Sequence, residues 1–211
     1  MTQSENSHLQ FMLQFEKKLW DRGIRLVAGI DEAGRGPLAG PVVAAAVIFP
    51  QDIALADIDD SKKLTEVKRE GLFNQIATHA LAVGVGVLSE KEIDCINILQ
   101  ASLKAMHLAV EKLKLQPDHL LIDGNQTLRN WLGNQTAIVK GDQKSLSIAA
   151  ASIIAKVTRD RMMVAYDKQY PQYGFAKHKG YGTKAHVQAI QKYGRCPIHR
   201  NSFHVRGLDD R

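Results

Sequence analysis

The sequence is poor in cysteine and proline, and it contains no long apolar run. Its 211 residues include 2 cysteines and 6 prolines, and aromatic residues make up 6% of the chain. Neither Cys95 nor Cys196 has a metal-like Cys/His spacing, which argues against a disulfide scaffold and against a zinc site. The stretch from Thr2 to Trp20 has the pattern of neither a secretory segment nor a membrane span. We therefore expect a cytoplasmic protein with no membrane association.

The overall composition is that of a globular protein with a basic surface. Hydrophobic residues make up 45% and charged residues 24% of the chain, which predicts one folding unit. The net charge is +6 and the sequence pI is about 9.3, values common among polyanion-binding proteins but also among other basic enzymes. Some basic residues are explained by solvated helix faces, but many recur beside expected loops, which favours an anionic partner: Lys62, Lys63, Lys140, Lys144, Lys156, Arg159, Lys177, Lys179, Lys184, Arg195 and Arg200.

One stretch carries the first chemical signal. An apolar run from Val27 predicts a buried strand that ends in two adjacent carboxylates, Asp31 and Glu32, before a loop containing Gly34, Arg35 and Gly36. Carboxylates at the end of a core strand need cations, and glycines let backbone N–H groups approach an anionic ligand. The pattern suggests metal-assisted phosphoryl chemistry. Taken alone, the acidic pair could equally be solvated side chains of a tight hairpin turn.

Two further apolar runs deliver an acid in the same way. The strand predicted over 119–123 ends in Asp123, followed by Gly124 and Asn125, and the run from Ala137 leads to Asp142. In an open α/β sheet, ligands bind at the carboxyl ends of strands, so the four acids of these segments could converge. Oxygen ligands suit Mg²⁺ or Mn²⁺. One such aspartate has ordinary explanations, but three occurrences favour a metal site.

The remaining periodicity predicts the framework around these strands. Apolar spacing predicts helices over 8–23, 66–79 with Thr65 as N-cap, 89–115 with a Ser89–Glu92 capping box, 146–166 and 185–193. Strands are expected over 26–30, 42–49 and 81–88, the last with glycines against which another backbone packs closely. We expect His107 to be a packed or surface histidine. We expect Arg159 and Asp160 to make local ion pairs, which leaves Asp160 outside the metal site, although a fifth acid could assist there.

The segment 171–183 differs in amino-acid composition from the rest of the chain. It combines tyrosines, glycines and the cations Lys177 and Lys179. Aromatic rings stack on bases or sugars and lysines meet phosphates, so the segment favours nucleic-acid binding. The alternative is a structural loop with packed tyrosines.

Six motifs, in order between about residues 26 and 205, together resemble bacterial ribonuclease HII, the type 2 ribonuclease H. They are Ala-Gly-Ile-Asp31-Glu32-Ala-Gly34-Arg35-Gly36-Pro37, Asp60-Ser61-Lys62-Lys63-Leu64, Ile122-Asp123-Gly124-Asn125, Lys140-Gly141-Asp142, Ser152-Ile-Ile-Ala-Lys156-Val-Thr-Arg159-Asp160 and His178-Lys179-Gly180-Tyr181-Gly-Thr183. The resemblance implies an α/β, ribonuclease H-like fold: a mixed central sheet flanked by helices, with a small helical C-terminal extension. We divide the chain into a helical extension (1–25), a catalytic domain (26–170) and a substrate-binding extension (171–211).

The resemblance also implies roles for particular residues. It assigns catalysis and the binding of two divalent ions, Mn²⁺ or Mg²⁺, to Asp31, Glu32, Asp123 and Asp142. It places Gly34, Arg35 and Gly36 against a ribonucleotide 2′-hydroxyl and makes Tyr181 the junction-sensing tyrosine, and we add Ser61, Lys62, Lys63, Asn125, Lys144 and Lys179 as substrate-binding residues. One departure from the family pattern is Gln143, where many relatives have serine.

The implied enzyme is a metal-dependent endonuclease. It would hydrolyse RNA in RNA–DNA hybrids and cut 5′ to single ribonucleotides in duplex DNA, leaving 5′-phosphate and 3′-hydroxyl ends. We expect a monomer, and the sequence does not identify a docking partner on the replication machinery. Two rival classes stay open: a non-catalytic hybrid-binding protein, which has no need of four acids beside a polyanion, and a DNA-directed nuclease or strand transferase of the same fold, which has no need to sense a 2′-hydroxyl.

Overall fold

The computed structural model describes residues 3–55, 58 and 64–204, so Ser61, Lys62 and Lys63 lie outside the described residues. A five-stranded sheet has the order β3-β2-β1-β4-β5, where β1 pairs antiparallel with β2 and parallel with β4. The other two pairings are antiparallel for β2 with β3 and parallel for β4 with β5. The strands are β1 Val27–Ala33, β2 Val42–Ile48, β3 Ala82–Leu88, β4 His119–Asp123 and β5 Asn134–Ile138. The prediction of a mixed sheet is confirmed.

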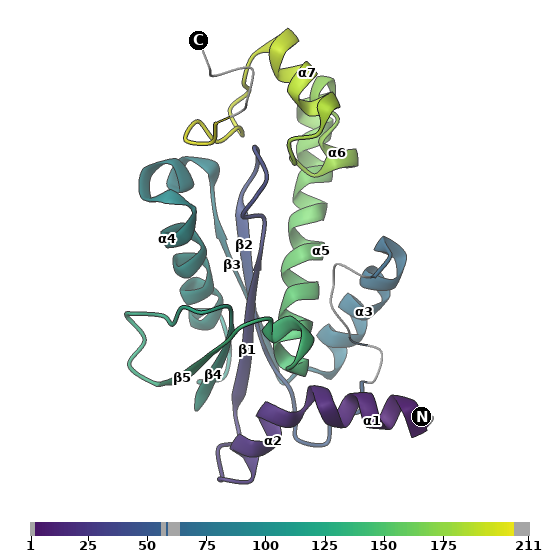
Figure 1. The fold of residues 1–211 in the computed structure, drawn as a ribbon, viewed down its shortest axis with the longest axis vertical. Coiled ribbons are helices and arrows are strands. Elements are labelled where there is room, and N and C mark those ends of the chain that lie inside the picture. Colours follow the sequence, from purple (N-terminus) through teal and green to yellow (C-terminus); the bar gives the residue numbers. More distant parts are fainter. Residues whose placement is uncertain (1–2, 56–57, 59–63, 205–211) are drawn as a thin grey trace.

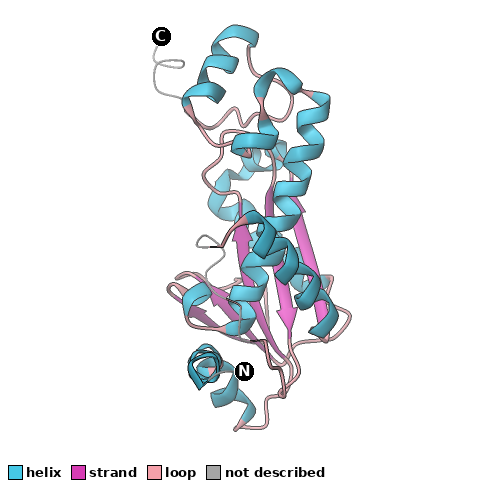
Figure 2. Ribbon diagram, turned by 90° about the vertical axis from the view of Figure 1, so that its right-hand side faces the viewer, coloured by secondary structure: helices cyan, strands magenta, loops and turns pink. Residues whose placement is uncertain are grey.

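Helices cover both faces of the sheet and extend beyond both of its ends. In Figures 1 and 2, α4 lies over one face, α5 and α3 lie over the other, and the pairs α1–α2 and α6–α7 lie at opposite ends of the molecule. The helices are α1 Gln3–Met12, α2 Gln14–Trp20, α3 Glu66–His79, α4 Glu90–Glu111, α5 Leu146–Gln169, α6 Phe175–His178 and α7 Lys184–Tyr193, with 3₁₀ turns η1 Gly141–Gln143 and η2 Pro171–Tyr173. The chain therefore forms a three-layer α/β core with helical additions at its two ends.

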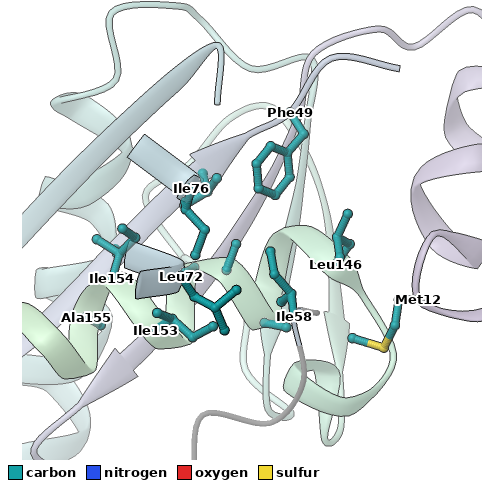
Figure 3. Close-up of a cluster of buried hydrophobic side chains, with 14 of the residues drawn as sticks. Met12, Phe49, Ile58, Leu72, Ile76, Leu146, Ile153, Ile154 and Ala155 are labelled. Atoms are coloured by element: carbon teal, nitrogen blue, oxygen red, sulfur yellow. The ribbon is translucent and has the colours of Figure 1, made fainter. Parts of the chain in front are cut away.

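Strand β2 divides the core because its side chains alternate between the two faces. Val43, Ala45 and Val47 belong to one buried cluster with residues of α1, α3 and α5. Ala44 and Ala46 belong to a second cluster with residues of α4. Figure 3 shows the first cluster, in which Met12 of α1 and Leu146 of α5 are neighbours. The sheet is thus apolar on both faces, as expected for a strand sequence without polar alternation.

Glycines bring two helices unusually close to the sheet. A Cβ placed on Gly84 or Gly86 of β3 would lie 2.0 Å from the carbonyl oxygens of Ala109 and Ala105 in α4. A Cβ on Gly29 of β1 would lie 2.1 Å from the main-chain carbon of Ser147 in α5. The close approach predicted for the 81–88 strand is confirmed, and β1 uses the same device at a position two residues before Asp31.

The predicted helix starts at Thr65 and Ser89 are confirmed. The Thr65 hydroxyl accepts a hydrogen bond from the backbone N–H of Lys68 at 3.3 Å. Ser89 and Glu92 form the reciprocal capping box, with distances of 3.0 Å and 3.4 Å. Each cap satisfies N–H groups that have no partner within the helix.

The helix predicted over 8–23 is wrong in its extent and continuity. The structure has α1 from Gln3 to Met12 and α2 from Gln14 to Trp20, separated at Leu13. Leu13 is itself buried, so the apolar spacing reports contact with the core through a break in the helix.

The long helix predicted to about Leu115 is also different. α4 ends at Glu111 and contains a break at Asn97, whose φ is +65°. The Asn97 side chain accepts a hydrogen bond from the N–H of Gln100 at 3.1 Å, which starts a second helical segment. Because the break shifts the phase, small residues such as Ala101 and Ala105 are buried while Leu99 is exposed.

The segment 171–183 is not a plain loop, because it contains η2 and α6. Tyr173 and Phe175 are buried with Met163 of α5 and Ile190 of α7 in a small cluster of their own. Tyr173 is therefore a packed structural residue, which was the alternative to nucleic-acid binding, whereas Tyr181 is 44% exposed. Among the helices that the structure describes, none is long and apolar enough to cross a membrane.

Candidate active site

The acidic pair lies within strand β1 and not after its end, which corrects the sequence interpretation. Asp31 pairs with Ala45 and Glu32 with Ala44 in the antiparallel ladder with β2. Successive side chains of a strand point to opposite faces, so the two acids are directed to different layers. Asp31 receives a hydrogen bond from Ser152 of α5, and Glu32 lines a small hollow with Ser102 of α4.

Asp123 is brought to this pair by the parallel pairing of β4 with β1. Ile122 lies opposite Ile30, which places Asp123 beside the level of Asp31, as the rule for parallel strand ends predicts. Asp142 arrives differently, because β5 ends at Ile138 and Asp142 lies in the turn η1, where it is 3% exposed. The N–H of Gly141 in that turn donates to Asp123 Oδ1 at 2.6 Å, which ties the turn to the end of β4.

The surroundings of the acids oppose their negative charge. Burial raises the pKa of Asp31 well above its ordinary value, and the charges of Glu32 and Asp123 raise it further. The Ser152 hydroxyl and the Glu32 N–H, which lies 2.7 Å from Asp31 Oδ1, act in the opposite direction. Burial also raises the pKa of Glu32, although Arg35 Nη1 lies 3.1 Å from its carboxylate and Asp123 adds repulsion. The fold therefore opposes ionisation of Asp31 and Glu32, and a cation bound between the carboxylates would favour their charged forms.

A hollow of about 250 Å³ opens beside these acids. Ten residues line it: Asp31, Glu32, Ala33, Gly34, Arg35, Gly36, Asp123, Ser152, Lys156 and Tyr181. Sequence reasoning had not placed Ser152 and Lys156 in the site, although their i, i+4 spacing puts them on one face of α5. Lys156 Nζ lies 2.7 Å from Asp160, so the local ion pair predicted for Asp160 is confirmed, with Lys156 as its partner.

The chemistry of the donors fits hard divalent cations. Asp31, Glu32 and Asp123 offer only oxygen atoms, and Asp31 is a buried carboxylate whose neighbours are acidic. Within the described residues, no three acidic, histidine or cysteine side chains form a ready-made metal cage. Asp31 and Glu32 line the hollow from β1 and Asp123 lines it from β4. Asp142 does not line it, and lies in η1 next to Gly141, whose N–H donates to Asp123.

Two buried arginines shape the glycine segment at the rim of the hollow. Arg200 donates to the carbonyl oxygens of Gly34 at 2.6 Å and Arg35 at 3.0 Å. Arg159 donates to Pro41 at 2.9 Å, and a Cβ on Gly34, where φ is +97°, would lie 2.2 Å from its Nε. The segment is therefore held by its carbonyls, which fixes the orientation of its peptide groups.

Tyr181 closes the other side of the hollow. A Cβ on Gly36 would lie 3.7 Å from a ring carbon of Tyr181, so the ring stands beside the glycine segment. The carbonyl of Gly180 accepts a hydrogen bond from Leu38 at 2.8 Å, and Arg159 donates to Lys179 at 2.9 Å. Two segments far apart in sequence thus form one rim of the hollow.

Comparison with known proteins decides the family of the chain. The family model for ribonuclease HII matches residues 28–206. A ribonuclease HII of Acetivibrio thermocellus is 61% identical over 94% of this chain and 77% of its own length. Another, from Geobacter metallireducens, is 60% identical over 93% of this chain and 91% of its own length. The chain belongs to the ribonuclease HII family.

Solved structures support the same assignment of fold. Ribonuclease H2 from Pyrococcus horikoshii has a TM-score of 0.72 at 28% identity, covering 85% of this chain and 94% of that one. Ribonuclease HII from Archaeoglobus fulgidus, solved in complex with PCNA, has a TM-score of 0.71 at 28% identity, covering 88% and 99%. The fold is also shared with Bst-RNase HIII, described in complex with Mn²⁺, at 19% identity, a TM-score of 0.61 and coverage of 81% and 63%. The ribonuclease H-like fold is confirmed.

Of the other described residues that we predicted to bind substrate, one lines a hollow and two do not. Asn125 lines the smaller hollow that it shares with Glu32 and Asp123. The ammonium groups of Lys144 and Lys179 donate to the backbone carbonyls of Val139 at 2.8 Å and Ala176 at 2.5 Å. Neither lysine is among the described residues that line the two hollows, and their contacts with substrate stay predictions.

Two buried histidines form a chain of hydrogen bonds that ends at the backbone carbonyl of Tyr181, and no pattern in the sequence had indicated them. Cys196 N–H donates to His199 Nδ1 at 2.8 Å, so His199 carries its proton on Nε2. That group faces His186 Nε2 at 3.1 Å, and His186 Nδ1 in turn donates to the carbonyl of Tyr181 at 2.9 Å. Burial lowers the pKa of each imidazole to about 4. Both histidines are therefore neutral at pH 7, with fixed tautomers.

Proposed function

We propose that this ribonuclease HII, an endoribonuclease by family, hydrolyses RNA in RNA–DNA hybrids and cuts duplex DNA 5′ to single ribonucleotides, acting as a monomer. The products would carry 5′-phosphate and 3′-hydroxyl ends. The observation that carries the proposal is the hollow itself, because Asp31, Glu32 and Asp123 meet there with the Gly34–Gly36 segment and Tyr181. The acids serve phosphodiester hydrolysis, and the rim serves recognition of a sugar.

We assign the binding of two divalent cations to Asp31, Glu32, Asp123 and Asp142. Their carboxylates would supply the oxygen ligands, and a bound cation would relieve the burial and repulsion that raise the pKa of Asp31. When bound, the cations supply a lowered pKa for the attacking water and charge stabilisation for the leaving 3′-oxygen. Mn²⁺ and Mg²⁺ both suit this donor set.

The remaining residues of the hollow bind and orient the substrate. Backbone groups of Gly34, Arg35 and Gly36, held in place by Arg200, would contact the ribonucleotide 2′-hydroxyl. A site that pairs a hydroxyl is left with unmatched polar groups when the hydroxyl is absent, which gives discrimination against DNA. Tyr181 would pack on the neighbouring sugar, and Arg35 balances the charge of Glu32 while half-exposed to an incoming phosphate.

The test is a cleavage assay on matched duplexes with Mg²⁺ and Mn²⁺ in parallel. The substrates are duplex DNA, the same DNA with one ribonucleotide, and an RNA–DNA hybrid. We expect cleavage of the last two only, with incision on the 5′ side of the lone ribonucleotide. Binding without cleavage would indicate the hybrid-binding class, and equal cleavage of all three would indicate a DNA-directed nuclease.

A further inference from the structure

Glu16 of α2 is a buried carboxylate that lines neither of the hollows beside the acidic cluster. It is 1% exposed, and its Oε1 accepts three hydrogen bonds from the first residues of the α5 region. The donors are the Ser145 hydroxyl at 2.6 Å, the Ser147 hydroxyl at 2.5 Å and the Ser147 N–H at 3.0 Å. Its Oε2 has no hydrogen-bond partner within the described residues.

Capping of α5 does not by itself account for this arrangement. The Ser145 side chain already caps α5 by accepting a hydrogen bond from the N–H of Ile148 at 3.3 Å, and the Ser147 N–H needs only one more acceptor, which water can supply at a helix start. A second, charged acceptor brought from another helix must be desolvated, and burial raises the pKa of Glu16 accordingly. The negative charge gains from the helix dipole, but its oxygen without a partner remains a cost. The hydrogen bonds of Glu16 therefore hold the start of α5 in place, while its burial lowers the free energy of unfolding.

Hydrogen bonds connect the start of α5, which Glu16 contacts, to the acids assigned as metal ligands. Ser145 N–H donates to the carbonyl of Gly141 at 2.9 Å, and Gly141 N–H donates to Asp123 at 2.6 Å. Asp142 lies in the same turn as Gly141. The chain of contacts from Glu16 therefore reaches one assigned ligand and the turn that bears another in three steps.

A second path leads from Glu16 to β1. The main chain of Ser147 lies so close to Gly29 that a Cβ there would be 2.1 Å away. Gly29 precedes Asp31 by two residues, and one turn and a half further along α5 Ser152 donates to Asp31. The axial position of α5 against β1 thus determines whether Ser152 meets Asp31.

We propose that Glu16 is a positioning residue for the metal-binding carboxylates, holding the start of α5 so that Asp142, Asp123 and Asp31 keep their mutual arrangement. The inference rests on the proposed function, since it takes these acids as ligands. It gives the N-terminal helices a role in catalysis without contact with substrate. Leu9, Met12 and Leu13 belong to the buried cluster that also contains Leu146, which stands between Ser145 and Ser147 in the sequence. Met12 and Leu146 are neighbours in Figure 3, so α1 and the break at Leu13 hold the helix that carries Glu16 against the start of α5.

The experiment compares Glu16→Ala and Glu16→Gln with Leu19→Ala. Leu19 is a buried residue of the same helix α2, so its truncation loosens packing while the Glu16 hydrogen bonds remain. For each variant we would measure the thermal midpoint, Mn²⁺ binding by calorimetry without substrate, the Mn²⁺ concentration for half-maximal cleavage, and duplex affinity in chelator.

We expect Glu16→Ala to weaken Mn²⁺ binding by about tenfold, as for the loss of other groups that orient metal ligands. Duplex affinity in chelator should stay unchanged. Glu16→Gln keeps an oxygen acceptor and should stay within about threefold of wild type, by the same reasoning. Leu19→Ala should lower the thermal midpoint without shifting Mn²⁺ binding.

Unchanged Mn²⁺ binding in Glu16→Ala, or an equal shift in Leu19→Ala, overturns the proposal. If Glu16→Ala does not fold, Ser147→Ala replaces it, because this change removes one donor and keeps the carboxylate. A shift of Mn²⁺ binding in the same direction then supports the proposal, and none overturns it. Calorimetry separates this result from the proposed function, since a wild-type protein that binds Mn²⁺ but cuts no ribonucleotide fails only the function.

Discussion

At the scale of single residues, Asp31 is the side chain whose ionisation the fold opposes most clearly. It is buried beside Glu32 and Asp123, and the Ser152 hydroxyl compensates only in part. A group of this kind lowers the stability of the metal-free protein and raises the affinity for cations. Its replacement therefore has opposite effects on stability and activity.

Asp31→Asn should lower kcat by about a thousandfold or more, since metal-ion catalysis is worth several kcal/mol of transition-state stabilisation. Binding of the hybrid should survive, because the basic surface is unchanged. Single-turnover cleavage and duplex binding in chelator measure the two quantities. Asp21→Asn, at an exposed acid of the N-terminal segment, is the matched control and should leave both unchanged. Substantial turnover of Asp31→Asn at saturating metal would remove Asp31 from the ligand set.

The same substitution should be neutral or stabilising in chelator. The folded protein holds the pKa of Asp31 above 3.8, the value in the unfolded chain, so the folded state binds more protons than the unfolded state above that pH. The free energy of unfolding therefore falls as the pH rises from 3.8 toward the pKa of the folded state. The stability advantage of Asp31→Asn should therefore widen from acid to neutral pH, by up to about 1.4 kcal/mol per unit of pKa elevation. Denaturant unfolding at pH 4.5 and pH 7 tests this, and a marked loss of stability at pH 7 would mean that Asp31 has a structural partner.

Tyr181 tests recognition at the residue scale. Tyr181→Ala should reduce kcat/KM at a single embedded ribonucleotide by about tenfold, the value of one aromatic contact, and should affect a long RNA–DNA hybrid less. Tyr181→Phe keeps the ring and should behave like wild type on both substrates. Equal losses on the two substrates would assign Tyr181 to the shape of its loop and exclude it from recognition.

At the scale of elements, the histidine pair joins α7 to the segment that carries Arg200. His186 is the third residue of α7, and His199 adjoins the arginine that holds Gly34 and Arg35. The groups around the pair are His178, stacked on His186 at 4.5 Å, and Arg195, Cys196 and Tyr173. A proton on either imidazole would remove an acceptor from the chain of hydrogen bonds that ends at Tyr181.

This arrangement predicts a pH dependence. The imidazoles have a pKa of about 4 when folded and 6.5 when unfolded, so the unfolded state binds more protons between these values. Stability is complete above pH 6.5 and falls as pH drops toward 4. His199→Gln removes one titrating group and should reduce the slope by about 1.4 kcal/mol per pH unit. Parallel pH profiles of the unfolding free energy for wild type and variant would contradict the assignment.

At the scale of the whole molecule, the net charge of +6 favours a polyanion, and the number of phosphates that the basic side chains contact sets the salt dependence of binding. Lys179→Ala should weaken binding of all duplexes alike and make the slope of log affinity against log salt shallower by about 0.9, the value for one phosphate contact. Lys114→Ala is the control, since Lys114 precedes β4, at the opposite end of that strand from Asp123. An unchanged slope for Lys179→Ala would mean that its ammonium stays on the Ala176 carbonyl.

The sequence by itself located β2, β3, β4 and most helix starts, and it nominated candidate ligands whose role stays a prediction. Alternation and capping are local, so β2, Thr65 and Ser89 could be located from a few neighbouring residues. The motifs around Asp31 and Asp123 could be recognised from the sequence because a buried apolar run rarely ends in an acidic residue. The family assignment followed from the order of such motifs.

Only the tertiary structure decided which groups support the site. Asp31 and Glu32 lie within β1 because β2 continues opposite them. Ser152, Arg200 and Glu16 act through partners that are more than 100 residues away in the sequence. Hydrogen bonds of this kind leave no periodicity in the sequence, since each depends on where another element stops. A buried glutamate in an amphipathic helix looks like any polar residue until the helix that it contacts is in place.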